Sequence, residues 1–133
     1  METVTLDIKP LPSRGARGQD NSSIFTCNLP TLIANMKQSL SWAQGELNSM
    51  ILLKSPGKKI VLTAVHKGTE ITSFQSNDSI SFQVIEGKLI FHSRKKTVCL
   101  NKGQFLTYNE NSGYSLSTGE VTVFLLTILQ TVH

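Results

Sequence analysis

The sequence lacks the features of several protein classes. No apolar run reaches the roughly 18 residues that a membrane-spanning helix needs, so we expect no membrane contact. The first residues, METVTLDIK, contain no basic region followed by an apolar stretch. No secretory signal is therefore indicated, and we expect a cytoplasmic protein. No internal repeat is present, and 133 residues with 39% hydrophobic content are the size of one domain with its own core.

Cysteine and histidine are scarce, with two and three residues. Cys27 and Cys99 are far apart and lack metal-ligand spacing, so in a reducing compartment we expect two free thiols. If Lys95 and Lys96 form a two-residue hairpin loop, His92 faces Cys99 and its imidazole could activate the thiol. A three-residue loop breaks that pairing, and no third orienting group is evident, so a catalytic pair is the weaker interpretation.

Positive charge exceeds negative charge, for a net charge of +4, but the cations lie at turns. Lys58 and Lys59 follow a Ser-Pro-Gly turn, and residues 94–96 form the tip of a predicted hairpin. Basic residues at such tips are usually solvated strand ends that discourage edge pairing. A nucleic-acid surface would cluster its charge and interleave aromatic side chains, which lie inside predicted strands here. We expect no nucleic-acid partner.

The N-terminal region differs from the rest of the chain. Residues 2–8 alternate between apolar and polar side chains, which predicts a short half-buried strand. Residues 10–23 are rich in Pro, Gly, Ser and charge, and indicate a linker or extended arm. We therefore divide the chain into a strand and arm over residues 1–26 and a single domain over residues 27–133.

The arm also bears on oligomeric state. A strand held by a linker of about a dozen residues reaches a neighbouring subunit's sheet edge as easily as its own. We therefore expect a homodimer. The alternative is a monomer whose first strand folds back onto its own sheet.

A helix is predicted after Asn28, which is a suitable N-cap, with Pro30 in the first turn. Its expected buried stripe is Leu32, Ile33, Met36 and Leu40. From residue 49 the pattern changes to short strands with frequent turn residues, which is typical of an all-β sandwich or barrel. The strands are predicted at 50–53, 60–65, 80–85, 88–93, 97–100, 104–108 and 121–129.

Glycines recur through this strand-rich region at Gly68, Gly87 and Gly103, with fifteen residues between the last two. Their spacing resembles the two sequence motifs of the cupins, the RmlC-like superfamily. The segments LPTLIANMKQSLSWAQGE and VFLLTIL are similar to those of short single-domain bacterial cupins. The resemblance implies a double-stranded β-helix, a jelly-roll barrel with a short N-terminal helix.

The positions that the resemblance marks as metal ligands are substituted. Phe74, Ser76 and Ile80 stand where the first cupin motif has two histidines and a glutamate, and Tyr114 stands at the histidine of the second. First-row metals in such sites need imidazole and carboxylate donors, and none of these four side chains provides one. We expect no metal and no other cofactor.

The same positions outline a possible pocket inside the barrel. A second alignment of the first motif places Ser73 and Gln75 at the histidine positions. An apolar cavity with a few polar groups is a common small-molecule site. Its predicted lining residues are Phe74, Gln75, Ser76, Ile80, Phe82 and Tyr114. The alternative is that Phe74 and Phe82 fill the barrel and leave no cavity.

These patterns favour a metal-free, noncatalytic cupin that binds a small molecule in the barrel or serves as an assembly module. The alternative is a metal-independent enzyme, such as an isomerase of a sugar or keto compound, with Tyr114 or His66 as acid or base. A lone histidine at a strand end more often packs than catalyses, so we assign no catalytic residue.

Overall fold

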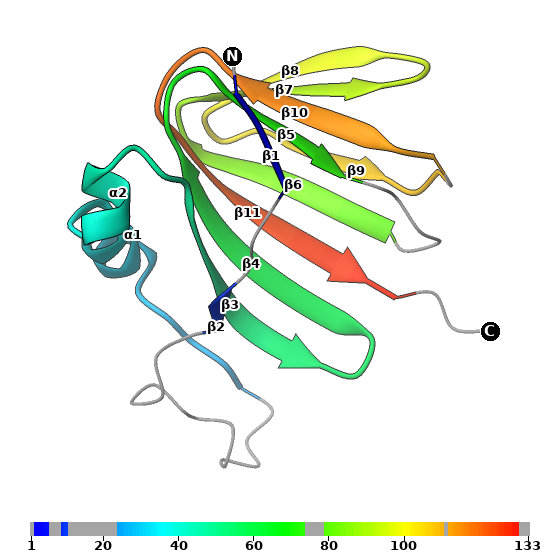
Figure 1. Cartoon of the computed structure of the whole chain (residues 1–133). Coiled ribbons are helices and arrows are strands. Elements are labelled where there is room, and N and C mark those ends of the chain that lie inside the picture. The colour runs from blue at the N-terminus through cyan, green and yellow to red at the C-terminus, as the bar shows by residue number, and fades with distance from the viewer. Residues whose placement is uncertain (1, 6–8, 11–23, 74–78, 111, 131–133) are drawn as a thin grey trace.

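The computed structural model describes residues 2–5, 9–10, 24–73, 79–110 and 112–130 (Figure 1). Two helices precede most of the strands, α1 (Leu29–Lys37) and α2 (Leu40–Ala43). The strands are β1 (Glu2–Thr5), β2 (Lys9–Pro10), β3 (Asn48–Ser55), β4 (Lys58–Val65), β5 (Thr69–Ser73), β6 (Ser79–Glu86), β7 (Lys88–Ser93), β8 (Thr97–Asn101), β9 (Phe105–Tyr108), β10 (Tyr114–Thr118) and β11 (Thr122–Leu129).

The strands form two sheets that face each other (Figure 1). Sheet A has the order β1-β5-β10-β7-β8, and sheet B has the order β2-β3-β4-β11-β6-β9. From β4 to β7 the chain crosses to the other sheet at every step, and it does so again from β8 to β11. This repeated crossing winds a double-stranded β-helix, so the predicted all-β jelly roll is confirmed.

All seven strands predicted from residue 49 onward are present, because each contains enough apolar residues to show its alternation. Three further strands, β2, β5 and β10, were not predicted. The sequences of β5 and β10, TEITS and YSLST, are mostly small and polar. Ile71 and Leu116 nevertheless face the core and are 2% exposed. Pairing between β5, β10 and β7 stabilises segments whose own sequences carry a weak strand signal.

Helix α1 begins as predicted. The side-chain oxygen of Asn28 accepts a hydrogen bond from the Thr31 backbone N–H at 3.1 Å. Ile33 and Met36 are buried against sheet B, and Leu32 is partly buried. The prediction for Leu40 was wrong, since its side chain is 74% exposed. The helical stripe breaks before Leu40 because α1 ends at Lys37 and the chain changes direction at Ser39.

Ser39 begins the second helix. Its hydroxyl accepts the Trp42 backbone N–H at 3.2 Å and donates to the Met36 carbonyl at 2.8 Å. One side chain therefore satisfies groups at the end of α1 and at the start of α2. The resulting corner places α2 near the end of β4.

The N-terminal residues lie on both sheets of their own chain. Strand β1 pairs in parallel with β5 in sheet A, and β2 pairs in parallel with β3 in sheet B. Residues 6–8 of the predicted strand lie outside the described residues. Within this chain the first strand folds back onto its own sheet, as in the monomer alternative.

Two apolar layers hold the domain together. The larger one fills the barrel between the sheets, and the smaller one lies under α1 on the outer side of sheet B (Figure 1). Lys37 at the end of α1 forms an ion pair with Glu86 at 2.6 Å. Because both side chains are partly exposed, this pair contributes at most about 1 kcal/mol, and burial of Ile33 and Met36 dominates. No helix among the described residues is long and apolar enough to cross a membrane.

Candidate functional site

A cluster of aromatic rings occupies the middle of the barrel. Its members are Phe82, Phe91, Tyr108, Tyr114 and Phe124. Phe82 lies at the centre, with ring centroids 5.8 Å from Phe91, 5.5 Å from Tyr114 and 5.9 Å from Phe124. These tilted and edge-on arrangements add about 0.5–1.5 kcal/mol per pair to the stabilisation from burial.

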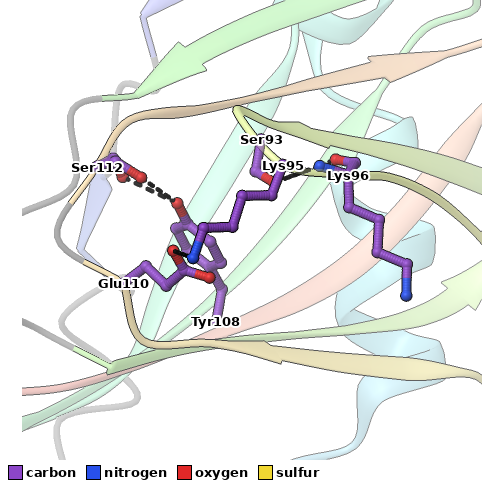
Figure 2. A network of polar contacts seen from close by, with 6 residues as sticks. All are labelled: Ser93, Lys95, Lys96, Tyr108, Glu110 and Ser112. Carbon is purple, nitrogen blue, oxygen red and sulfur yellow. Dashed lines mark hydrogen bonds and ion pairs between the residues drawn. The ribbon is translucent and has the colours of Figure 1, made fainter.

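The tyrosine rings close one side of this cluster. Tyr114 stacks on Phe91 with centroids 5.6 Å apart, and Tyr108 meets the edge of Phe91 at 5.0 Å. Tyr108 and Tyr114 are only 7% and 8% exposed. The Tyr108 hydroxyl lies 2.6 Å from the Ser112 hydroxyl, so its polar end is satisfied within the chain (Figure 2). The barrel interior is therefore packed by aromatic side chains over its described part.

The predicted pocket residues divide into two groups. Ile80, Phe82 and Tyr114 lie in the barrel core, with exposures of 4%, 0% and 8%. Phe74, Gln75 and Ser76 lie outside the described residues. Whether this set lines a ligand pocket therefore stays a prediction.

Sequence reasoning missed three members of the aromatic cluster, Phe91, Tyr108 and Phe124. Each of these rings belongs to a core cluster that contains buried residues from both sheets. The alternation within β7, β9 and β11 placed them on one face but did not identify which face was inward. The two sheets had to be assembled before these rings met.

The fold family often holds a metal in this barrel, but the residues at the motif positions do not fit one. Ile80 has no donor atom, and Tyr114 lies against the rings of Phe82 and Phe91. In the part of the chain that the structure describes, no group of three or more His, Cys, Asp or Glu residues could hold a metal. No chemical step is therefore derived through a metal.

We expect the purified protein to contain no stoichiometric iron, nickel, zinc or manganese. The physical reason is the donor set, because apolar and phenolic groups bind divalent first-row ions poorly at neutral pH. Elemental analysis of protein purified without chelator measures this directly. A metal at one equivalent per chain would show that other residues form a site.

His92 does not face Cys99, so the weaker interpretation, a catalytic pair that required a Lys95-Lys96 loop, is not supported. The two-residue loop of this hairpin is Arg94 and Lys95, since the Ser93 N–H donates to the Lys96 carbonyl at 2.9 Å. His92 is consequently opposite Thr97, and Cys99 is opposite Ile90. Lys95 and Lys96 are poor residues for the two central positions of a tight turn. The side chain of Ser93 also caps the Arg94-Lys95 loop by hydrogen bonding to the Lys96 backbone (Figure 2).

The side chains around this hairpin have other partners. His92 Nε2 lies 2.9 Å from the Ser117 hydroxyl. Lys95 at the tip forms an ion pair with Glu110 at 3.1 Å, which connects the hairpin to the segment after β9 (Figure 2). Cys27 and Cys99 are both free thiols, as predicted, and both are exposed.

The side chain of His66 packs against Trp42. Its ring stacks on Trp42, with centroids 3.6 Å apart and an interplanar angle of 21°. Its Nε2 lies 3.0 Å from the Trp42 carbonyl, and since a carbonyl only accepts, this nitrogen donates. The His66 carbonyl also accepts the hydroxyls of Thr69 and Thr118. The residue thus fastens α2 to the end of β4, which supports a packing role.

One polar group inside the barrel differs from its surroundings. Thr63 lies on β4 between the inward-facing Val61 and Val65, and is 0% exposed. Its hydroxyl has no hydrogen-bond partner among the described residues. A buried hydroxyl without a partner is costly, so this position could receive a hydrogen bond from a small molecule or a water.

Known structures resemble this architecture. A cupin-2 domain protein from Shewanella frigidimarina superposes with a TM-score of 0.63, at 13% identity, over 79% of this chain and 95% of that chain. A cupin superfamily protein from Desulfitobacterium hafniense gives 0.59, at 15% identity, over 65% and 79%. A conserved protein of unknown function from Streptococcus pyogenes gives 0.61, at 19% identity, over 68% and 79%.

The chain has the fold of a small cupin domain. The resemblance predicted from the glycine spacing is thereby confirmed for the fold. No family model matches the sequence, and no curated protein matches it significantly. At these identities the similarity extends to the fold and not to an activity.

Proposed function

We propose that this cupin is a metal-free, noncatalytic domain that acts in the cytoplasm as an assembly module. The observation that carries the proposal is the aromatic packing of the barrel. Phe82, at its centre, is 0% exposed and touches three other rings. A substrate placed there would have to displace side chains that stabilise the fold.

Two further observations support this proposal. His66, the histidine considered as an acid or base, is occupied by contacts with Trp42. The two exposed free thiols suit a reducing compartment. With its interior serving as a core, the surface of the domain is the part available for function.

Light scattering of the intact chain tests the assembly role. We expect a homodimer over concentrations of about 1 to 100 µM, because an assembly module acts by association of its subunits. Native mass spectrometry of the same sample reads the oligomer and any bound molecule together. A monomer throughout this range would reject the assembly role.

The Thr63 hydroxyl, which has no hydrogen-bond partner in the part of the chain that the structure describes, favours a second candidate, a small molecule in the barrel. The mass spectrum distinguishes the two functions. A stoichiometric organic adduct would favour the ligand-binding cupin, whereas a dimer without an adduct supports assembly. No observation on the described residues favours the isomerase alternative.

A further inference from the structure

Two basic hairpins lie at the same end of the barrel. One joins β3 to β4 and the other joins β7 to β8, and both tips lie on the right in Figure 1. In the strand register, the end of β11 lies beside the starts of β4 and β6, and the end of β7 lies beside the start of β10. The hairpins are distant in the sequence, so only the fold brings them to one end. We call this set of cations the basic end: Lys54, Lys58, Lys59, Arg94, Lys95 and Lys96.

Most cations of the basic end lack an acidic partner. Among the acidic residues that the structure describes, only Glu110 lies at this end, and it pairs with Lys95 at 3.1 Å (Figure 2). The other cations of the basic end form no ion pair with a described residue. The opposite end differs, because its lysines lie among acids. These residues are Lys37, Lys67, Lys88 and Lys102 with Glu46, Glu70, Glu86 and Glu120.

Two lysines of the basic end face each other directly. Lys54 on β3 is opposite Lys59 on β4. Like charges in directly opposed positions of a sheet are destabilising. Among the described residues no carboxylate offsets this repulsion, whereas an anion bound at this end would relieve it.

The separation of the hairpins sets the size of such an anion. Strand β8 contacts β6, which is two strand positions from β4 in sheet B. With strands about 4.8 Å apart and packed sheets about 10 Å apart, the hairpins are roughly 15 Å from each other. A single carboxylate or phosphate cannot contact both. An extended peptide advances about 3.3 Å per residue, so about six residues would reach from one hairpin to the other.

We propose that the basic end binds an extended acidic segment of another protein, whose carboxylates contact both hairpins. This partner goes beyond the proposed assembly role, which concerns copies of this chain. A lysine ammonium is a point charge on a flexible stem, and it can follow carboxylates that have no fixed geometry. The long-range field of the unpaired cations would attract such a segment.

Nucleic acid fits this end less well. Phosphate recognition favours the planar fork of arginine, and single strands stack on exposed aromatic rings. Apart from Arg94, the cations of the basic end are lysines. The aromatic residues of this end, Tyr108 and Tyr114, are buried in the barrel.

Octaglutamate, bound to the full chain, tests the proposal by fluorescence anisotropy of the labelled peptide. We expect binding at about 20 mM salt and a dissociation constant about tenfold or more higher at about 150 mM, because salt screens exposed charges. Triglutamate is too short to reach both hairpins and should bind about tenfold more weakly. No binding of octaglutamate at low salt, or equal affinity for both peptides, would overturn the proposal.

Paired substitutions locate the site. The double variant Lys58→Gln with Lys59→Gln removes two charges from one hairpin, and Arg94→Gln with Lys96→Gln removes two from the other. Each is expected to raise the dissociation constant of octaglutamate about fivefold or more. Circular dichroism checks that both double variants fold.

The matched control is Lys67→Gln with Lys102→Gln, which removes the same charge from the opposite end. It should leave the dissociation constant within about twofold of the wild type. An equal effect of all three double variants would mean that net charge attracts the peptide, and would reject the basic end as the site.

A single-stranded DNA of eight nucleotides distinguishes the class of partner. Weaker binding than that of octaglutamate supports an acidic protein segment. Tighter binding that is lost in the two hairpin variants would make nucleic acid the partner and overturn the proposal. Neither result depends on dimer formation, so the assembly role is tested separately.

Discussion

Phe82→Ala is expected to lower the free energy of unfolding by about 3–5 kcal/mol. The side chain is 0% exposed and lies between the rings of Phe91, Tyr114 and Phe124. Truncation removes its buried area and leaves a cavity that these large rings cannot close without leaving their rotamers. Urea denaturation monitored by circular dichroism measures the change.

A matched control separates this effect from truncation as such. Leu40→Ala removes an apolar side chain that is 74% exposed, and is expected to change stability by less than about 0.5 kcal/mol. A loss below about 1 kcal/mol for Phe82→Ala would mean that the barrel relaxes around the missing ring. That result would also weaken the argument that the barrel is a packed core.

Gly87→Ala is expected to cost about 2–5 kcal/mol, from backbone strain of about 1–2 kcal/mol and an overpacking term of about 1–3 kcal/mol. Gly87 has φ +84°, where side chains are disfavoured. An added Cβ would collide with the Val121 carbonyl oxygen and lie 2.8 Å from the Thr122 Cα. Both are backbone atoms, so the turn between β6 and β7 would have to move.

That movement has a further cost. The Thr122 hydroxyl accepts the Lys88 N–H at 3.1 Å and lies 2.9 Å from the Lys88 carbonyl. These bonds fasten the turn after Gly87 to the start of β11. Displacing the turn would weaken both hydrogen bonds of the Thr122 hydroxyl. This loss is costly because Thr122 is 0% exposed.

Gly68→Ala is the control for the conformational part of this effect. Gly68 has φ +82°, but an added Cβ meets no atom within 4 Å. It should therefore lose only about 1–2 kcal/mol. Thermal or chemical unfolding of both variants gives the difference. Equal losses would show that the contact with Val121 and Thr122 is relieved at little cost.

The candidate site illustrates how far residue patterns reach. Ile80 and Phe82, which were predicted to line the interior of the barrel, do face inward, and they share one face of β6 because side chains on a strand repeat every two residues. The hairpin register of His92 was left open by the sequence, and in the structure His92 is opposite Thr97. Hydrogen bonds of Ser93 with Lys96 selected Arg94 and Lys95 for the loop.

The sequence by itself determined the fold class. Glycine spacing, short alternating strands and the Asn28 cap are local signals, and each depends on a residue's own backbone preference or on its near neighbours. Tertiary structure alone decided which rings fill the barrel, that Trp42 stacks on His66, and that α1 packs on the outer side of sheet B. These features depend on contacts between residues distant in the chain. Such contacts form only when both sheets and the helices have assembled.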